Sequence, residues 1–148
     1  MANFAELRST GDGRGERNDC SVIALALTCD TTYDAAHAAL KKLGRRPRGR
    51  TRIGLTEKGA LELGRKTIHW FGWDHSTPEN IQHKALPIGS PLVKAKTMRT
   101  AERVLRKHFA GRKFLLFVEG HVAAFDGQSL QDWSKGRLHR IIKIIEVI

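Results

Sequence analysis

The sequence of 148 residues has only two cysteines and no long apolar run, and its first residues do not have the pattern of a signal peptide. Cys20 and Cys29 are too few for a disulfide framework and form no CxxC pair, so we expect free thiols, as in a reducing cytosol. No apolar run approaches the roughly 18–20 residues needed to cross a bilayer. The first ten residues lack a basic segment followed by an apolar one. These absences predict a cytoplasmic protein without a membrane partner.

Motifs that hold cofactors or metals are also missing. The glycines at residues 11–15 do not complete a P-loop or a GxGxxG motif after a strand. The seven histidines show no zinc-ligand spacing. We therefore expect no cofactor and no metal ion.

Positive charge is plentiful but concentrated in the middle of the sequence. The net charge of +11 comes from residues 41–66 (+8) and 67–113 (+6), whereas residues 1–40 sum to −3 and residues 114–148 to zero. A basic protein of this kind favours nucleic acid or another polyanion as a partner. Residues 44–52 form an arginine-rich loop that is either a solvated surface or a contact for phosphates or an acidic protein. Its arginines are Arg45, Arg46, Arg48, Arg50 and Arg52.

The length and the 41% apolar content suit one domain covering residues 1–148. Residues 1–18 are polar and rich in glycine, which predicts a loop. The apolar run at 20–27 predicts a buried helix capped by Asp19, and the capping box at 31–34 begins a second helix that ends at Gly44. Thr56 is expected to cap a brief helix, and residues 100–109 are amphipathic. Short strands and irregular structure are expected over residues 67–97.

The last forty residues have the twofold period of β-strands. Strands are predicted at 113–120, 121–125 and 129–133, and the β-branched run at 139–148 predicts a final strand. Asp126-Gly127 is typical of a two-residue hairpin. Because helices come first and the antiparallel strands last, the fold class expected is α+β.

Cys20 is the candidate nucleophile. A helix N-terminus supplies partial positive charge and unpaired N–H groups that stabilise a thiolate. Cys29 lies at the opposite end of the same predicted helix, where the dipole raises its pKa. A buried core thiol is the simpler interpretation of either cysteine alone.

A catalytic thiol needs an imidazole to move its proton, and the imidazole needs an acceptor that orients it. His121 begins the strand 121–125. A two-residue hairpin at Asp126-Gly127 would set His121 opposite Asp132, about 5 Å away between Cβ atoms. Asp126 itself is most simply a turn residue.

These residues resemble a known family. Asn18, Asp19 and Cys20 followed by SVIALA, and about 100 residues later GHVAAFDG and Asp132-Trp133, resemble the papain-like cysteine peptidase superfamily. The chain is similar to the bacteriocin-processing peptidase type and to short papain-like proteins of bacteriophages and bacteria. The resemblance covers residues 14–44 and 112–133. It implies a papain-like fold with N-terminal helices packed on a C-terminal antiparallel sheet, and a host-cytoplasmic location for a phage-encoded protein.

The resemblance also implies roles for three residues: Cys20 as nucleophile, His121 as general base and Asp132 as the orienting acid. One position departs from the family. Six residues before the nucleophile, where a Gln usually donates to the oxyanion, this chain has Arg14. Arg14 or Asn18 could donate instead, together with the backbone N–H of Cys20.

The function expected is thiol hydrolysis of a peptide or isopeptide bond in a protein substrate, through an acyl-enzyme on Cys20. An acyl transferase using the same residues is another possibility, since an amine can replace water. The alternative from a different class is a catalytically weak or inactive papain-like scaffold. That module would bind nucleic acid or an acidic host protein through residues 45–52 and the basic helix around 99–113.

Overall fold

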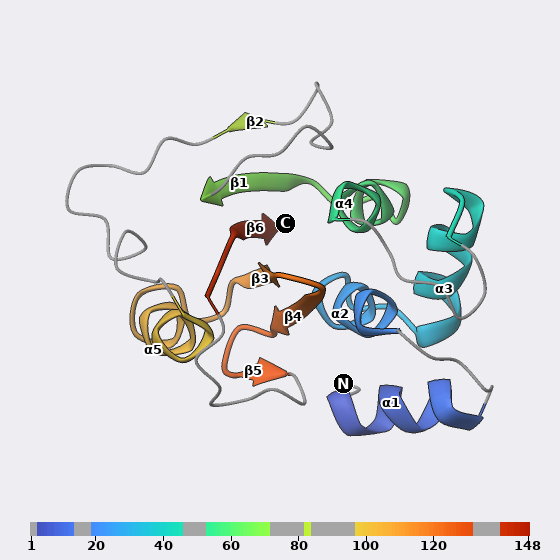
Figure 1. The fold of residues 1–148 in the computed structure, drawn as a ribbon, viewed down its shortest axis with the longest axis horizontal. Helices are drawn as coiled ribbons and strands as arrows, with labels where there is room; N and C mark the ends of the chain where they lie inside the picture. The colour runs from blue at the N-terminus through green and yellow to red at the C-terminus, as the bar shows by residue number, and fades with distance from the viewer. Residues whose placement is uncertain (1–2, 14–18, 46–52, 72–81, 84–96, 132–139) are drawn as a thin grey trace.

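The computed structural model describes residues 3–13, 19–45, 53–71, 82–83, 97–131 and 140–148 (Figure 1). This part of the chain contains helices and strands in mixed order, which confirms the α+β class. The helices are α1 (Phe4–Gly13), α2 (Cys20–Thr28), α3 (Tyr33–Lys42), α4 (Ile53–Glu62) and α5 (Met98–His108). The strands are β1 (Thr67–Phe71), β2 (Gln82–His83), β3 (Lys113–Val118), β4 (His121–Phe125), β5 (Leu130–Gln131) and β6 (Lys143–Val147).

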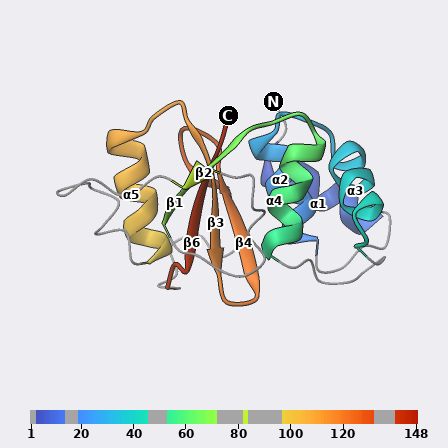
Figure 2. The same ribbon diagram turned by 90° about the horizontal axis from the view of Figure 1, so that it is seen from above.

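The strands form one six-stranded sheet in the order β2-β1-β6-β3-β4-β5. Its pairs are antiparallel except for β1 with β2, which are parallel. Helices α2 and α4 pack on one face of the sheet, with α1 and α3 outside α2, and α5 lies on the opposite face (Figure 2). The expected arrangement, N-terminal helices packed on a C-terminal sheet, therefore describes only part of the fold. A strand from the middle of the chain, β1, joins the sheet beside β6, and α5 covers the second face.

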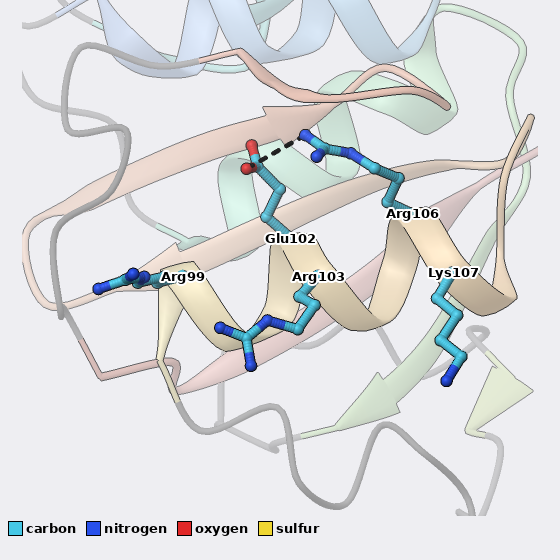
Figure 3. A pocket seen from close by; sticks show the side chains of 5 residues that line it. All are labelled: Arg99, Glu102, Arg103, Arg106 and Lys107. Carbon is cyan, nitrogen blue, oxygen red and sulfur yellow. Dashed lines mark ion pairs between the residues drawn. The ribbon is translucent and has the colours of Figure 1, made fainter.

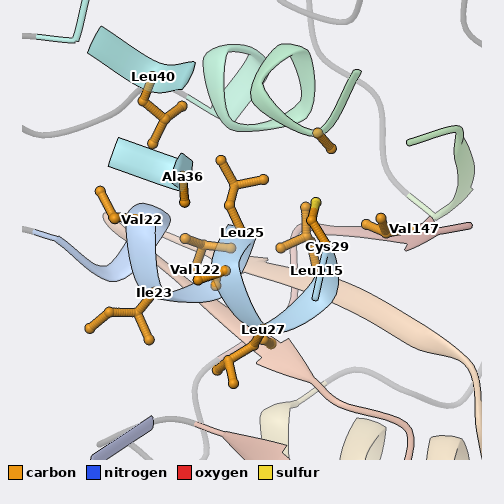
Figure 4. Close-up of a cluster of buried hydrophobic side chains, with 14 of the residues drawn as sticks. Val22, Ile23, Leu25, Leu27, Cys29, Ala36, Leu40, Leu115, Val122 and Val147 are labelled. Carbon is orange, nitrogen blue, oxygen red and sulfur yellow. The ribbon is translucent and has the colours of Figure 1, made fainter. Parts of the chain in front are cut away.

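Two hydrophobic clusters lie on the two faces of this sheet. Leu115 and Phe117 of β3 face the cluster shared with α2, α3 and α4 (Figure 4), whereas Phe114 and Leu116 face the cluster under α5. Side chains alternate between the faces along a strand, so a strand covered on both sides is apolar at nearly every position. This double coverage explains why residues 114–118 form an unbroken apolar run.

Helix α2 begins and ends where the sequence predicts. Cys20 is its first residue, Asp19 is its N-cap, and every residue from Ser21 to Thr28 is buried. The helix is apolar all round because the sheet covers one side and α1, α3 and α4 cover the rest (Figure 4). Gly44, at a φ of +104°, follows the end of α3 as expected of a helix-ending glycine.

Three predictions of local structure are wrong. Residues 4–13 form helix α1 where a loop is expected, because Asn3 and Glu6 make a reciprocal capping box that outweighs the glycines. Helix α3 is capped by Thr32, whose side chain accepts from the N–H of Ala35, one residue later than expected. Helix α4 already includes Thr56, which is an interior residue and not its cap.

Helix α5 and strands β3, β4 and β6 overlap the segments predicted for them, and residues 130–131 of the segment predicted at 129–133 form β5. Ala101 and Leu105 are buried against the sheet, as the amphipathic pattern indicates. On the same face Glu146 of β6 accepts from Trp70 Nε1 at 2.9 Å and pairs with the guanidinium of Arg112 through two contacts of 2.6 Å. Among the helices that the structure describes, none has the length and apolarity to cross a membrane.

Burial of α2 makes a stability prediction. Leu25 is fully buried, so Leu25→Ala should lower the free energy of unfolding by about 2–5 kcal/mol through lost apolar contacts and a residual cavity. Ile148, which is 55% exposed, offers a control, and Ile148→Ala should change the free energy of unfolding by no more than about 0.5 kcal/mol. Urea denaturation measures both, and equal effects would contradict the assigned burial.

Candidate active site

The tertiary fold brings Cys20 and His121 together from opposite ends of the chain. Cys20 begins α2, His121 begins β4, and α2 packs directly on β4. The side chain of His121 makes a hydrogen bond with the Cys20 thiol, and the backbone N–H of Val122 interacts with the same sulfur. Both side chains are half-buried, so the pair remains open to solvent on one side.

The environment of Cys20 favours its thiolate. Burial raises the pKa of the Cys20 thiol and is the largest single effect. The hydrogen bond with His121, the N–H of Val122, the charge of His121 and the Ser21 side chain together lower the pKa further than burial raises it. The net result is a pKa below the ordinary value of 9.0.

Cys29 shows the opposite behaviour at the other end of the same helix. It is buried, and burial raises the pKa of its thiol more than the hydrogen bond with Thr28 lowers it. Its nearest hydroxyl, Thr28 Oγ1, lies 4.0 Å from the sulfur. Of the two thiols, only Cys20 therefore combines a stabilised thiolate with access to solvent.

Asp19, directly before the thiol, is a buried carboxylate whose charge is balanced by its neighbours. Arg8 Nη1 lies 2.6 Å from Oδ1, and the Tyr33 hydroxyl donates to Oδ2 at 3.1 Å. A Cβ at Gly11 would overlap Oδ2 and come within 2.9 Å of the Tyr33 hydroxyl, so only glycine fits there. Without this compensation, the carboxylate would oppose a thiolate on the next residue.

Arg8 was missed by the sequence analysis because residues 1–18 were expected to be a loop. The signal that could have revealed it is the pair Asn3 and Glu6, whose spacing is that of a capping box. Helix α1 also reaches the strand next to β4, because the backbone N–H of Phe4 donates to Gln131 Oε1 at 3.2 Å. Helix α1 thus contacts both the start of α2 and β5.

The hairpin expected after β4 is wrong in length and register. Asp126 Oδ1 accepts from the N–H groups of Gln128 and Ser129, and the connection comprises residues 126–129 instead of two residues. Phe125 pairs with Leu130, whereas a two-residue hairpin would set Phe125 opposite Gln128 and His121 opposite Asp132. The two-residue connection lies one hairpin earlier, where Val118 pairs with His121.

Several predicted residues lie outside the described part of the chain. Asp132, the expected orienting acid, is one of them, as are the expected oxyanion donors Arg14 and Asn18. Of the arginines in the loop at 44–52, only Arg45 is described. It is 4% exposed, and such burial does not favour contact with a polyanion. The other four, outside the described residues, are Arg46, Arg48, Arg50 and Arg52.

A second group of ionisable side chains lies inside the protein, between α4 and the sheet. His69 Nε2 contacts Glu57 Oε1, Thr67 Oγ1 donates to the same oxygen at 3.1 Å, and Lys143 Nζ lies 3.5 Å from Glu57 Oε2. Glu57, His69 and Lys143 are at most 2% exposed. Because solvent does not reach it, this cluster cannot contact a peptide substrate, and its partners compensate its buried charges.

Cys20 and His121 provide two of the groups that nucleophilic acyl transfer requires, a thiol at a helix N-terminus and an imidazole in contact with it. In the described part of the chain, no three His, Cys, Asp or Glu side chains gather as ligands for a metal ion. Comparison with protein-family models, curated proteins and solved structures finds no match to this chain.

The two cysteines should differ in reactivity. In Cys29→Ala, which retains Cys20, the rate of iodoacetamide alkylation should rise with pH around a lower midpoint than in Cys20→Ala, which retains Cys29. The direction follows from the lowered pKa of Cys20 and the raised pKa of Cys29. Adding His121→Ala to the first variant should move the midpoint upward. Identical midpoints in all three proteins would contradict the assigned hydrogen bond.

The contact between Arg8 and Asp19 makes a separate prediction. Arg8→Met should lower the free energy of unfolding by about 1–3 kcal/mol, because it leaves a buried carboxylate without its cation. Ser9→Ala, at an exposed site of the same helix, is the control. In urea denaturation, the double variant Arg8→Met with Asp19→Asn should lose less free energy of unfolding than the two single variants lose together. Strict additivity would show that the pair does not interact.

Proposed function

We propose that the protein is a small papain-like thiol hydrolase that cleaves a peptide or isopeptide bond through an acyl-enzyme on Cys20. The observation that supports this best is the hydrogen bond between His121 and a thiol at the N-terminus of a buried helix. A thiol needs an adjacent base and a stabilised anion to act as a nucleophile, and both are present around Cys20. The lowered pKa of Cys20 supports the same proposal.

In the proposed first step, His121 takes the proton of the Cys20 thiol and the sulfur attacks the carbonyl carbon of the scissile bond. The carbonyl oxygen becomes an oxyanion, and the N–H groups in the first turn of α2, which have no partner within the helix, are its proposed donors. His121 then gives its proton to the departing amine. The tetrahedral intermediate collapses to a thioester on Cys20.

In the proposed second step, His121 takes a proton from water and the resulting hydroxide attacks the thioester. Collapse of the second intermediate breaks the carbon–sulfur bond, releases a carboxylic acid and restores Cys20 with its proton. An amine in place of water would give a new amide bond, which is acyl transfer. Asp132 is proposed, on the family resemblance alone, to orient the ring of His121 as the acceptor for its second nitrogen, because the two-residue hairpin that would set it opposite His121 is not the observed one.

Variants that keep only one of the two cysteines make the proposal testable. We expect the parent and Cys29→Ala to generate new peptide termini from a proteome-derived peptide library, detected by mass spectrometry, and Cys20→Ala to generate none. His121→Ala should cleave about 10²–10⁴-fold more slowly, which is the usual contribution of a general base. Addition of glycinamide tests acyl transfer, since ligated products would show that an amine resolves the thioester.

A control with a thiol-reactive probe addresses the case in which the library lacks the right sequence. Peptidyl vinyl sulfones should label the parent at Cys20, while Cys20→Ala stays unlabelled in its folded state. Equal labelling of the parent and Cys20→Ala would contradict the proposal. It would favour the alternative, a catalytically weak or inactive papain-like scaffold.

A further inference from the structure

Helix α5 presents a row of positive charges on the side away from the sheet. Arg99, Arg103 and Lys107 are spaced four residues apart, so they follow one stripe of the helix over about 12 Å of its axis. All three are exposed, and their side chains extend outward from the helix (Figure 3). Together with Glu102 and Arg106, they line a surface hollow of about 360 Å³.

The single carboxylate of α5 does not neutralise this stripe. Glu102 accepts from the N–H of Leu130 at 2.7 Å and lies 3.3 Å from Arg106, which donates to the carbonyl of Gln128 at 3.1 Å. These contacts hold α5 against the connection between β4 and β5. Within the described residues, no hydrogen bond or ion pair engages the three cations of the stripe.

Helix stability does not account for the stripe. Like charges four residues apart repel each other, and the stripe contains two such pairs. Arg99 is also in the first turn, where the helix dipole favours acidic residues, and that turn has none. Only Lys107, in the last turn, has a charge that suits the dipole. The first two arginines therefore destabilise the free helix, and a bound polyanion would remove that cost.

We propose that this stripe of α5 binds the phosphate backbone of a nucleic acid. Every exposed residue of α5 is basic or a histidine, and none is an apolar anchor of the kind found at the centre of protein interfaces. Interfaces with nucleic acids are instead polar and strongly positive. Two of the three cations are guanidinium groups, whose planar forks match phosphate oxygens. The exposed residues are Arg99, Arg103, Arg106, Lys107 and His108.

The position of α5 lets this binding coexist with chemistry at Cys20. Helix α5 and helix α2 cover opposite faces of the sheet, so a strand held on α5 does not cover the thiol (Figure 2). The net charge of +11 adds a long-range attraction for polyanions. The stripe thus recruits the protein to nucleic acid independently of the reaction proposed for Cys20.

Two variants with the same charge separate the stripe from the overall charge. One combines Arg99→Gln, Arg103→Gln and Lys107→Gln. The control combines Lys41→Gln, Lys58→Gln and Lys66→Gln, three exposed positions outside α5. Each loses three positive charges, and Gln preserves helix propensity. The probe is a fluorescent mixed-sequence DNA duplex of about 20 base pairs, titrated by anisotropy at several salt concentrations.

The stripe variant should bind the duplex at least about tenfold more weakly than the parent. Its slope of log K against log salt should become shallower by about 2.7, because each phosphate contact contributes about 0.9. The control should change this slope by less than about 1. The melting temperature of the free stripe variant should equal or exceed that of the parent, because repulsion is relieved, which excludes unfolding as the cause.

Two results would overturn the proposal. One is an equal loss of affinity in the stripe variant and the control, which would mean that only the overall charge attracts the duplex. The other is binding of polyglutamate as tight as binding of DNA, which would favour an acidic protein. Single-stranded RNA of the same length identifies the source of the phosphates, and a preference for either nucleic acid supports the proposal. Labelling of Cys20 should be unchanged in the stripe variant.

Discussion

The position of every group around the candidate active site depends on the burial of one apolar helix. Helix α2 has no polar stripe to expose, so it is stable only when the sheet covers one side and other helices cover the rest. Packing α2 on β4 places its first residue beside the start of that strand. The thiol of Cys20 thereby meets His121 and the backbone N–H of Val122, although about 100 residues separate them in the sequence. The same burial puts Cys29, at the other end of the helix, out of reach of solvent.

The two ends of α2 show how the local environment shifts the pKa of two cysteine thiols in opposite directions. Burial raises the pKa of both thiols, and only the contacts of Cys20 with His121 and Val122 outweigh it. A carboxylate next to Cys20 would disfavour a thiolate there, but contacts with Arg8 and Tyr33 balance the charge of Asp19. Because Arg8 comes from α1, the N-terminal helix contributes to the electrostatics of the site as well as to the packing of α2.

The sheet separates two kinds of chemistry. Its α2 face holds Cys20 and His121, whereas its α5 face exposes Arg99, Arg103 and Lys107, which have no acidic partner among the described residues. Basic residues are concentrated in the middle of the sequence. In the folded protein some of these cations are buried or paired, and others are exposed. Arg45 is buried, and Arg106 contacts Glu102 and the carbonyl of Gln128, so Arg99, Arg103 and Lys107 are the cations of α5 that no described acidic group engages. Charge counted along the chain does not by itself locate a binding surface, because burial and internal pairing remove some cations from it.

Features that depend on neighbours in the chain can be predicted from the amino-acid sequence. Apolar runs marked α2 and β3, Gly44 marked the end of α3, and the position of Cys20 at a helix start followed from Asp19 and the run behind it. Helix α1 was missed because its capping box was overlooked among glycines. Four other features became visible in the folded protein: the contact of Cys20 with His121, the pairing of Arg8 with Asp19, the register of β5 and the packing of α5 on the second face of the sheet. Local hydrogen bonds and periodicity depend on adjacent residues, whereas contacts between distant segments depend on how all the apolar faces pack at once.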